Sequence, residues 1–194
     1  MATTRTPRGA WIDAGLRALA VAGPDGVRVE SLAQSLGVSK GGFYWHFEGR
    51  PVLLHEMLDR WERLMVDEVI ERVEQEPADD ARAKLRRLFV LGSSRGRPRT
   101  ADDADAPTPM EIELAIRDWG RRDEAVAARL AHVDNRRMDY MRKLFAEICS
   151  DAEEVEVRSL LAFCVFIGNH FIAAGHGTRS RSEVVRLTLE RLLA

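Results

Sequence analysis

The string KGGFYWHF, residues 40–47, places a lysine and two glycines ahead of five consecutive aromatic or imidazole side chains. Rings of this kind can pack on sugars and bases, and tyrosine, histidine and lysine can bind phosphates. Two glycines inside a helix cost about 1 kcal/mol each relative to alanine, a cost that makes sense where a backbone must come close to a partner. The pattern therefore indicates a nucleic-acid contact; the alternative is an aromatic core cluster beneath a short helix.

The helical period divides these rings between two faces. Phe43 and Phe47 are four residues apart and should face the core. Tyr44 and His46 should point outward, and Trp45 can pack on sugar or methyl groups. The run therefore predicts one buried and one exposed face.

A helix-turn-helix would position this run. The first helix is expected over residues 29–36, with Val29, Leu32, Ala33 and Leu36 facing the core. Gly37 tolerates the left-handed backbone that the turn needs. The second helix is expected over residues 40–47, with the Ser39 hydroxyl accepting the backbone N–H of Gly42 as its cap. This second helix would be a recognition helix.

The segment GVSKGGFYWHFEGR closely resembles the helix-turn-helix signature of the tetracycline-repressor (TetR) family, and the resemblance covers residues 11–54. It implies a transcriptional regulator that binds a palindromic operator as a homodimer. It also places Tyr44, His46 and Arg50 on phosphates. The full set of predicted DNA contacts is Arg28, Ser39, Lys40, Gly41, Gly42, Tyr44, Trp45, His46 and Arg50.

Two positions depart from the family pattern. Arg28 stands where a threonine usually caps the helix; arginine cannot cap, but it can bind the phosphate. Leu19 stands where an aromatic residue is usual near the end of the first helix. Neither departure removes the expectation of DNA binding.

Apolar residues recur at three- and four-residue spacing throughout, so the sequence predicts an all-α protein of about nine helices. We expect a three-helix DNA-binding domain over residues 1–50 and a helical effector-binding and dimerisation domain over residues 51–194. The expected helices cover residues 7–22, 29–36, 40–47, 51–75, 79 or 80 to 92, 110–119, 124–149, 152–174 and 181–193.

Residues 93–109 are polar and rich in proline, with a basic half followed by an acidic half. Such a segment cannot bury apolar surface, so we expect a mobile loop. The alternative is a second DNA contact through Arg95, Arg97 and Arg99.

A small-molecule effector site is implied by the family resemblance, and such sites are mainly apolar with a few polar groups. Asn169 and His170 are polar residues in an otherwise apolar helix; the alternative is that they bond to neighbouring helices or across a dimer. A metal at His170 and His176 is not favoured, because six-residue spacing places them on different helix faces. The candidate pocket residues are Trp61, Met65, Phe89, Ile116, Trp119, Met138, Met141, Phe145, Phe166, Asn169 and His170.

The last two helices are the candidate dimer interface, because their apolar stripes could pack against a second copy. The alternative is an ordinary monomer core. The candidate interface residues are Leu161, Cys164, Val165, Gly168, Ile172, Val184, Leu187 and Arg191.

The net charge of −2 argues against a nonspecific architectural DNA binder, which relies on phosphate neutralisation. Residues 1–50 nevertheless hold six Lys/Arg and four Asp/Glu, and this positive net charge suits a DNA-binding segment. Two cysteines fit no metal spacing, and no apolar stretch is long enough for a membrane helix. We expect a cytoplasmic protein without cofactor, metal or membrane partner. An enzyme built on His132, His170 or His176 is the competing class.

Overall fold

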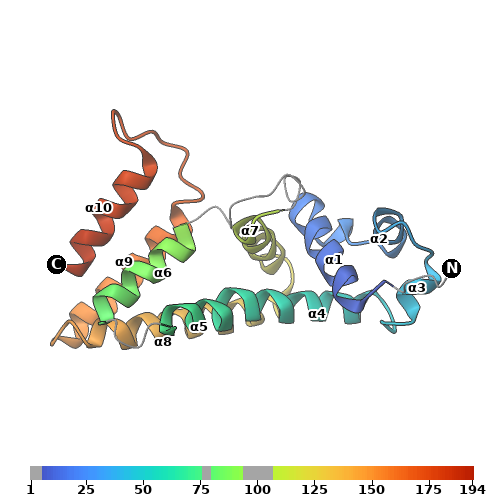
Figure 1. Ribbon diagram of the computed structural model, residues 1–194, viewed down its shortest axis with the longest axis horizontal. Coiled ribbons are helices and arrows are strands. Elements are labelled where there is room, and N and C mark those ends of the chain that lie inside the picture. The colour runs from blue at the N-terminus through green and yellow to red at the C-terminus, as the bar shows by residue number, and fades with distance from the viewer. Residues whose placement is uncertain (1–5, 76–79, 94–106) are drawn as a thin grey trace. The chain divides into compact units, whose positions relative to one another are not determined.

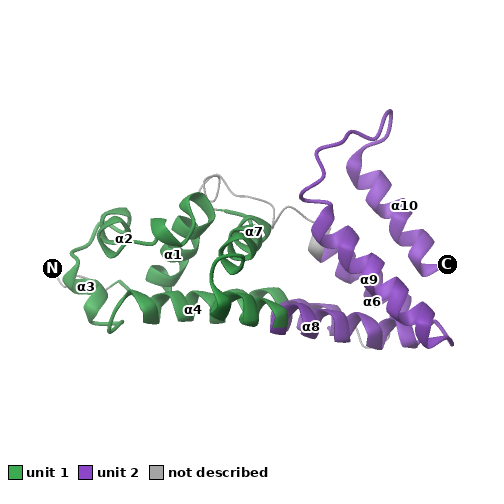
Figure 2. Cartoon of the chain, turned by 180° about the vertical axis from the view of Figure 1, so that it is seen from behind, with its two compact units in different colours: residues 1–65, 96–131 green, residues 66–95, 132–194 purple. Residues whose placement is uncertain are grey.

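The computed structural model describes residues 6–75, 80–93 and 107–194, and within these ranges the regular elements are all helical (Figure 1). The prediction of an all-α fold is confirmed. The chain forms two compact units (Figure 2): unit 1 spans residues 1–65 and 96–131, and unit 2 spans residues 66–95 and 132–194. The predicted loop over residues 93–109, including Arg95, Arg97 and Arg99, lies mostly outside the described residues.

Three helices at the start of unit 1 contain the predicted helix-turn-helix: α1 (Arg8–Ala22), α2 (Val29–Ser35) and α3 (Gly41–Tyr44), with a 3₁₀ turn at Pro24–Gly26. Gly23 ends α1 with φ of 66°, and Gly37 makes the turn after α2 with φ of 66°, a backbone region that favours glycine. The predicted helix over residues 40–47 is shorter than expected.

A long helical stretch follows, made of α4 (Arg50–Glu62), a π-helical segment (Arg63–Asp67) and α5 (Glu68–Glu74). Apolar spacing predicts an inner stripe of Leu54, Met57, Leu58, Trp61, Leu64, Met65, Glu68 and Val69. Met57, Leu58 and Trp61 are buried as predicted, but Leu53 is buried in place of Leu54, and the stripe then continues through Val66 and Val73. The expected Leu64, Met65, Glu68 and Val69 are only half-buried. A π turn holds one residue more than an α turn, so it shifts the buried stripe by one position.

Helix α7 (Pro109–Gly120) completes unit 1 together with the first part of α8 (Glu124–Ala146). Thr108 begins α7 with a capping box: its hydroxyl accepts the N–H of Glu111, whose carboxylate accepts the N–H of Thr108. Proline at the first helical position adds to this start signal.

Unit 2 contains α5, α6 (Ala81–Ser93), the rest of α8, α9 (Ala152–Gly168) and α10 (Arg181–Leu193). The sequence offers Asp79 or Asp80 as the cap of α6 and Ser180 or Ser182 as the cap of α10, and Asp80 and Ser180 take these positions. Helix α9 ends at Gly168, six residues before the expected Ala174. The backbone carbonyls of Asn169 and Ala174 instead accept hydrogen bonds from Arg181, so tertiary contacts hold this segment outside the helix. No helix of the described chain is long and apolar enough to cross a membrane.

Candidate nucleic-acid interface

The turn between α2 and α3 is held by backbone hydrogen bonds. The N–H of Val38 donates to the carbonyl of Ala33 at 3.0 Å, and the N–H of Gly42 donates to the carbonyl of Ser39 at 3.0 Å. The expected cap through the Ser39 hydroxyl is therefore wrong. Lys40 already has helical backbone angles, so the chain begins to coil at Ser39 and its carbonyl reaches Gly42 directly.

Helix α3 is anchored from below by aromatic rings. Phe43 and Phe47 are buried and stacked, with ring centroids 5.0 Å apart. The edge of Trp11 from α1 meets Phe43 at 5.5 Å and 71°. Ring pairs in this geometry contribute about 0.5–1.5 kcal/mol beyond their buried area, so a helix of a single turn can be held rigidly.

The opposite face of α3 presents aromatic rings to solvent. Tyr44 is 59% exposed and Trp45 is 75% exposed. Tyr44 touches the core cluster through an edge contact with Phe43, at 5.2 Å between ring centroids, and most of its surface and of the neighbouring Trp45 is left open for a contact. The aromatic core cluster that was the alternative therefore accounts for Phe43 and Phe47, but not for Tyr44 and Trp45.

His46 does not point freely outward as expected. Its ring is half-buried, and Nε2 lies 2.9 Å from the backbone carbonyl of Thr6. Because a carbonyl only accepts, this geometry places a proton on Nε2. The backbone carbonyl of His46 accepts a hydrogen bond from Arg8. The residue thus fastens the start of α1 to the end of the recognition segment.

Two predicted phosphate ligands make contacts inside the domain. Arg50 donates from Nε to the carbonyl of Val27 at 2.7 Å and from a second nitrogen to the carbonyl of Pro24. Arg28 donates from Nε to the carbonyl of Asp25 at 3.0 Å, and its side chain caps no helix. Both guanidinium groups therefore order the connection between α1 and α2.

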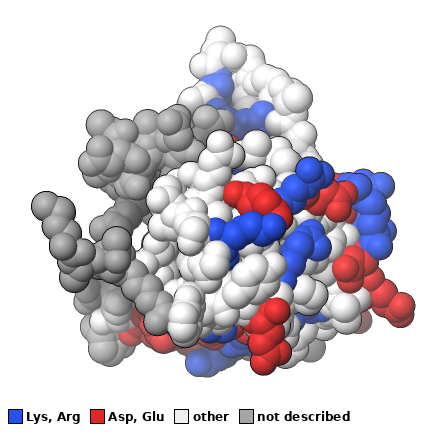
Figure 3. Space-filling model, turned by 90° about the vertical axis from the view of Figure 1, so that its right-hand side faces the viewer, with Lys and Arg blue, Asp and Glu red and all other residues white. Residues whose placement is uncertain are grey.

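Lys40, the first residue of the recognition segment, forms an ion pair with Glu30 of α2. The hydrogen bond from Lys40 lowers the pKa of the Glu30 carboxyl and raises that of the Lys40 amine. Both side chains are exposed. This face is accordingly not uniformly basic: blue and red side chains lie next to each other in Figure 3.

The glycines of α3 have room for a side chain among the described residues. A Cβ at Gly41 would lie 3.7 Å from its nearest neighbour, and one at Gly42 would lie 3.6 Å from Trp11, both ordinary contact distances. Neither glycine has a positive φ. Alanine would therefore fit at both positions, so the described contacts do not require glycine there.

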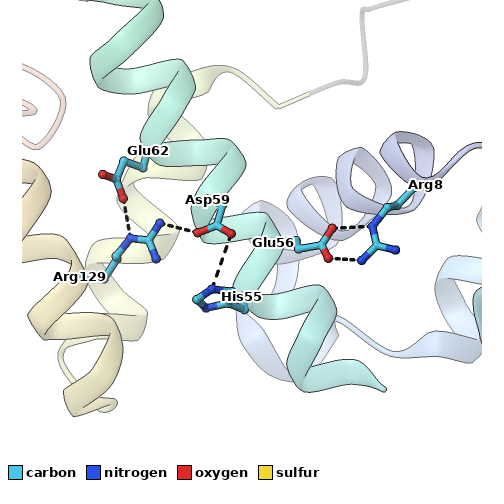
Figure 4. Close-up of polar contacts among 6 residues, drawn as sticks. All are labelled: Arg8, His55, Glu56, Asp59, Glu62 and Arg129. Carbon is cyan, nitrogen blue, oxygen red and sulfur yellow. Dashed lines mark hydrogen bonds and ion pairs between the residues drawn. The ribbon is translucent and has the colours of Figure 1, made fainter. Parts of the chain in front are cut away.

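Ion pairs hold α4 on two sides (Figure 4). Arg8 of α1 pairs with Glu56 and lies 4.5 Å above the ring of Phe47. Arg129 of α8 donates to Asp59 and Glu62, each at 2.5 Å. Sequence reasoning missed these contacts, since charges on a helix surface do not show which distant residue they meet.

A buried carboxylate was also not predicted from the sequence. Glu113 of α7 is fully buried, accepting a hydrogen bond from Trp61 Nε1 at 2.9 Å and from Arg117 at 2.9 Å. The only available signal was the four-residue spacing of Glu113 and Arg117, which is equally typical of a solvent-exposed pair.

The predicted effector residues are divided between the two units. Trp61, Met65, Ile116 and Trp119 belong to unit 1, and the other seven belong to unit 2. Four of those seven are core residues of unit 2: Phe89, Met138, Met141 and Phe145. The structure therefore does not gather the predicted pocket within one compact unit.

Some of the predicted dimer residues lie beside other exposed apolar side chains on α9. Val157, Leu160 and Leu161 are about half-exposed, and Cys164 is exposed as well. Their spacing of three, four and seven residues places them on one face of α9. Leu187 and Arg191 are exposed on α10, whereas Val165, Gly168 and Val184 are half-buried and Ile172 lies beyond the end of α9.

Comparison with known proteins agrees with this geometry. Residues 12–57 match the family described as bacterial regulatory proteins, tetR family. This match covers the helix-turn-helix and the first part of α4. No curated protein matches the chain in sequence.

Solved structures share the fold of this chain over nearly its whole length. A putative transcriptional regulator from Saccharomonospora viridis, in complex with choline, is 18% identical with a TM-score of 0.72, covering 95% of this chain and 93% of that one. A putative TetR-family transcriptional regulator from a Rhodococcus species is 21% identical with a TM-score of 0.67, covering 96% and 98%. AibR, in complex with isovaleryl coenzyme A and operator DNA, is 14% identical with a TM-score of 0.67, covering 96% and 97%.

Proposed function

We propose that this chain is a ligand-responsive repressor of the tetR family that binds a palindromic operator as a homodimer. The observation that carries the proposal is the exposure of Tyr44 and Trp45 on a short helix whose other face is anchored by Phe43 and Phe47. An exposed aromatic pair on a rigid helix can reach phosphates and thymine methyl groups in a major groove. We infer no catalytic role.

The nine predicted DNA contacts take different parts in this proposal. Tyr44, Trp45, Gly41 and Gly42 would face the DNA. Lys40 would leave its ion pair with Glu30 and bind a phosphate or a base instead. The other four residues would mainly hold the DNA-facing surface in place: Arg28, Ser39, His46 and Arg50. Their donors that are not used inside the domain would bind phosphates.

Homodimer formation is supported by the exposed apolar face of α9 with Leu187 on α10. An operator bound by a dimer should contain two half-sites about one helical turn apart, or a multiple of it.

Repression is favoured over activation, since a dimer on its operator blocks polymerase without further contacts. In this scheme residues 1–50 bind DNA and residues 51–194 provide dimerisation and effector response. The solved relatives in complex with choline and with isovaleryl coenzyme A support a ligand-responsive role.

Selection from random duplexes tests this proposal. We expect a palindrome to be enriched, and Tyr44→Ala to weaken binding to all duplexes by about tenfold, the scale of one or two lost contacts. Val90→Ala, an exposed apolar change in unit 2, is the control and should bind as the wild type does. Unchanged affinity of the Tyr44 variant would refute the phosphate assignment. Enrichment of no palindrome would favour an architectural binder instead.

A further inference from the structure

A cavity of about 240 Å³ lies between α1, the α4 region and the start of α7, entirely within unit 1. Its walls are mainly apolar, with Leu16 from α1, Trp61 from α4, Met65 from the π-helical segment and Ile112 from α7. It therefore shares a compact unit with the recognition helix, whereas most of the predicted effector residues belong to unit 2.

The Trp61 wall of this cavity is fixed by buried polar contacts. Trp61 Nε1 donates to Glu113 of α7 at 2.9 Å, and the same carboxylate pairs with Arg117 at 2.8 Å. A fully buried carboxylate needs such partners to offset its lost hydration. The indole ring thus has one orientation, and α4 and α7 are joined directly beside the cavity.

Helix α1 connects the cavity to the recognition helix. Leu16 lines the cavity, and Trp11 on the same helix supports Phe43 of α3. The contact between α1 and α4 is close, because a Cβ at Gly15 would lie 2.6 Å from the Met57 sulfur. A molecule that enlarges the cavity must therefore displace α7 or tilt α1, and a tilt of α1 moves the ring beneath α3.

Among the described residues that line the cavity, the charged ones are Asp13 and Arg17, both exposed and one helical turn apart on α1. An ion of either sign would be attracted by one of them and repelled by the other. A neutral group that both donates and accepts a hydrogen bond suits both side chains. The volume is smaller than the roughly 300–1,000 Å³ of sites for drug-sized ligands, so the occupant should have one or two rings.

We propose that this cavity is the effector site, and that it takes a neutral one- or two-ring molecule carrying a hydroxyl or amide group. The inference rests on the proposed ligand-responsive regulation and assigns the place and the ligand class. Binding here would weaken operator binding through α1.

Calorimetry with full-length protein tests the site, using benzyl alcohol and 2-naphthol as neutral probes and benzoate and benzylamine as charged ones. We expect both alcohols to bind, and each ion to bind about tenfold more weakly than benzyl alcohol. Ile112→Trp fills the cavity and should weaken 2-naphthol binding by about tenfold or more. Leu114→Trp is the matched control, since Leu114 is half-buried on the same helix but outside the cavity wall. Both variants should retain the wild-type helical content and cooperative unfolding.

Saturating 2-naphthol should weaken binding to the selected operator by about tenfold in the wild type, and not in Ile112→Trp. The proposal is overturned if neither alcohol binds, if Ile112→Trp binds as tightly as the wild type, or if operator affinity does not change at saturation. A chain that selects no operator would contradict the proposed function itself. Calorimetry would still decide whether the cavity binds the probes.

Discussion

Trp61 donates a 2.9 Å hydrogen bond from its indole nitrogen to the buried carboxylate of Glu113. The two residues lie 52 positions apart in the chain, and their contact joins the long helix after the recognition segment to α7. The bond thereby connects the packing of unit 1 with the wall of its cavity.

Removal of this carboxylate should destabilise the protein. We expect Glu113→Ala to reduce the free energy of unfolding by about 3 kcal/mol, the cost of breaking a buried ion pair from one side. Asp118→Ala is the matched control, because it removes the exposed ion pair between Asp118 of α7 and Arg122 just beyond the end of that helix. This pair also has four-residue spacing and should contribute less than about 0.5 kcal/mol. Urea unfolding followed by circular dichroism measures both. Equal losses of unfolding free energy in the two variants would show that the buried contacts of Glu113 do not stabilise α7.

The pairing of Lys40 with Glu30 should restrain DNA binding. We expect Glu30→Gln to raise affinity for all duplexes by about two- to threefold, because Lys40 is released and a negative charge near the phosphates is lost. Fluorescence anisotropy at several salt concentrations measures the change. In a Lys40→Ala background the same substitution should have a smaller effect. An equal effect in both backgrounds would mean that Glu30 acts independently of Lys40.

Acid should weaken the attachment of α1 to α4. The hydrogen bond from Arg8 lowers the pKa of the Glu56 carboxyl, so the folded state holds this proton less tightly than the unfolded state. The pair therefore stabilises the fold above the unfolded pKa of about 4.3, and this contribution is lost as the pH falls through the lower folded pKa. Because both groups are partly exposed, we expect it to be at most about 1 kcal/mol.

Unfolding of the wild type and Glu56→Gln from pH 7 downward measures this contribution. The difference between them should be largest near neutral pH and should disappear in acid. Glu71→Gln, an exposed carboxylate on α5, is the control. A difference that grew as the pH fell would contradict the sign of this argument.

The exposed face of α9 should be required for dimerisation. We expect Val157→Glu to weaken the dimer by about a hundredfold, because a carboxylate would be buried in an apolar interface. Val90→Glu introduces the same change at a valine of similar exposure on α6, 66% against 50%, and should leave the dimer intact. Sedimentation equilibrium measures both. If neither substitution changes the oligomeric state, this face is not the interface.

Local patterns alone determined the helical class, the helix-turn-helix at residues 29–47 and the burial of Phe43 and Phe47. Each depends on contacts between residues close in sequence: helical periodicity, a glycine in a left-handed turn, and two rings one helical turn apart. The capped starts of α6 and α10 could be predicted for the same reason.

The tertiary structure decided what the polar side chains do. The sequence placed Arg50 and His46 on phosphates by resemblance, whereas the fold brings the carbonyls of Val27 and Thr6 within their reach. It likewise buried Glu113 beneath Trp61 and divided the predicted effector residues between two units. A charged side chain can bind any partner within reach, and residues distant in the chain become its neighbours only through folding, so sequence spacing could not predict these contacts.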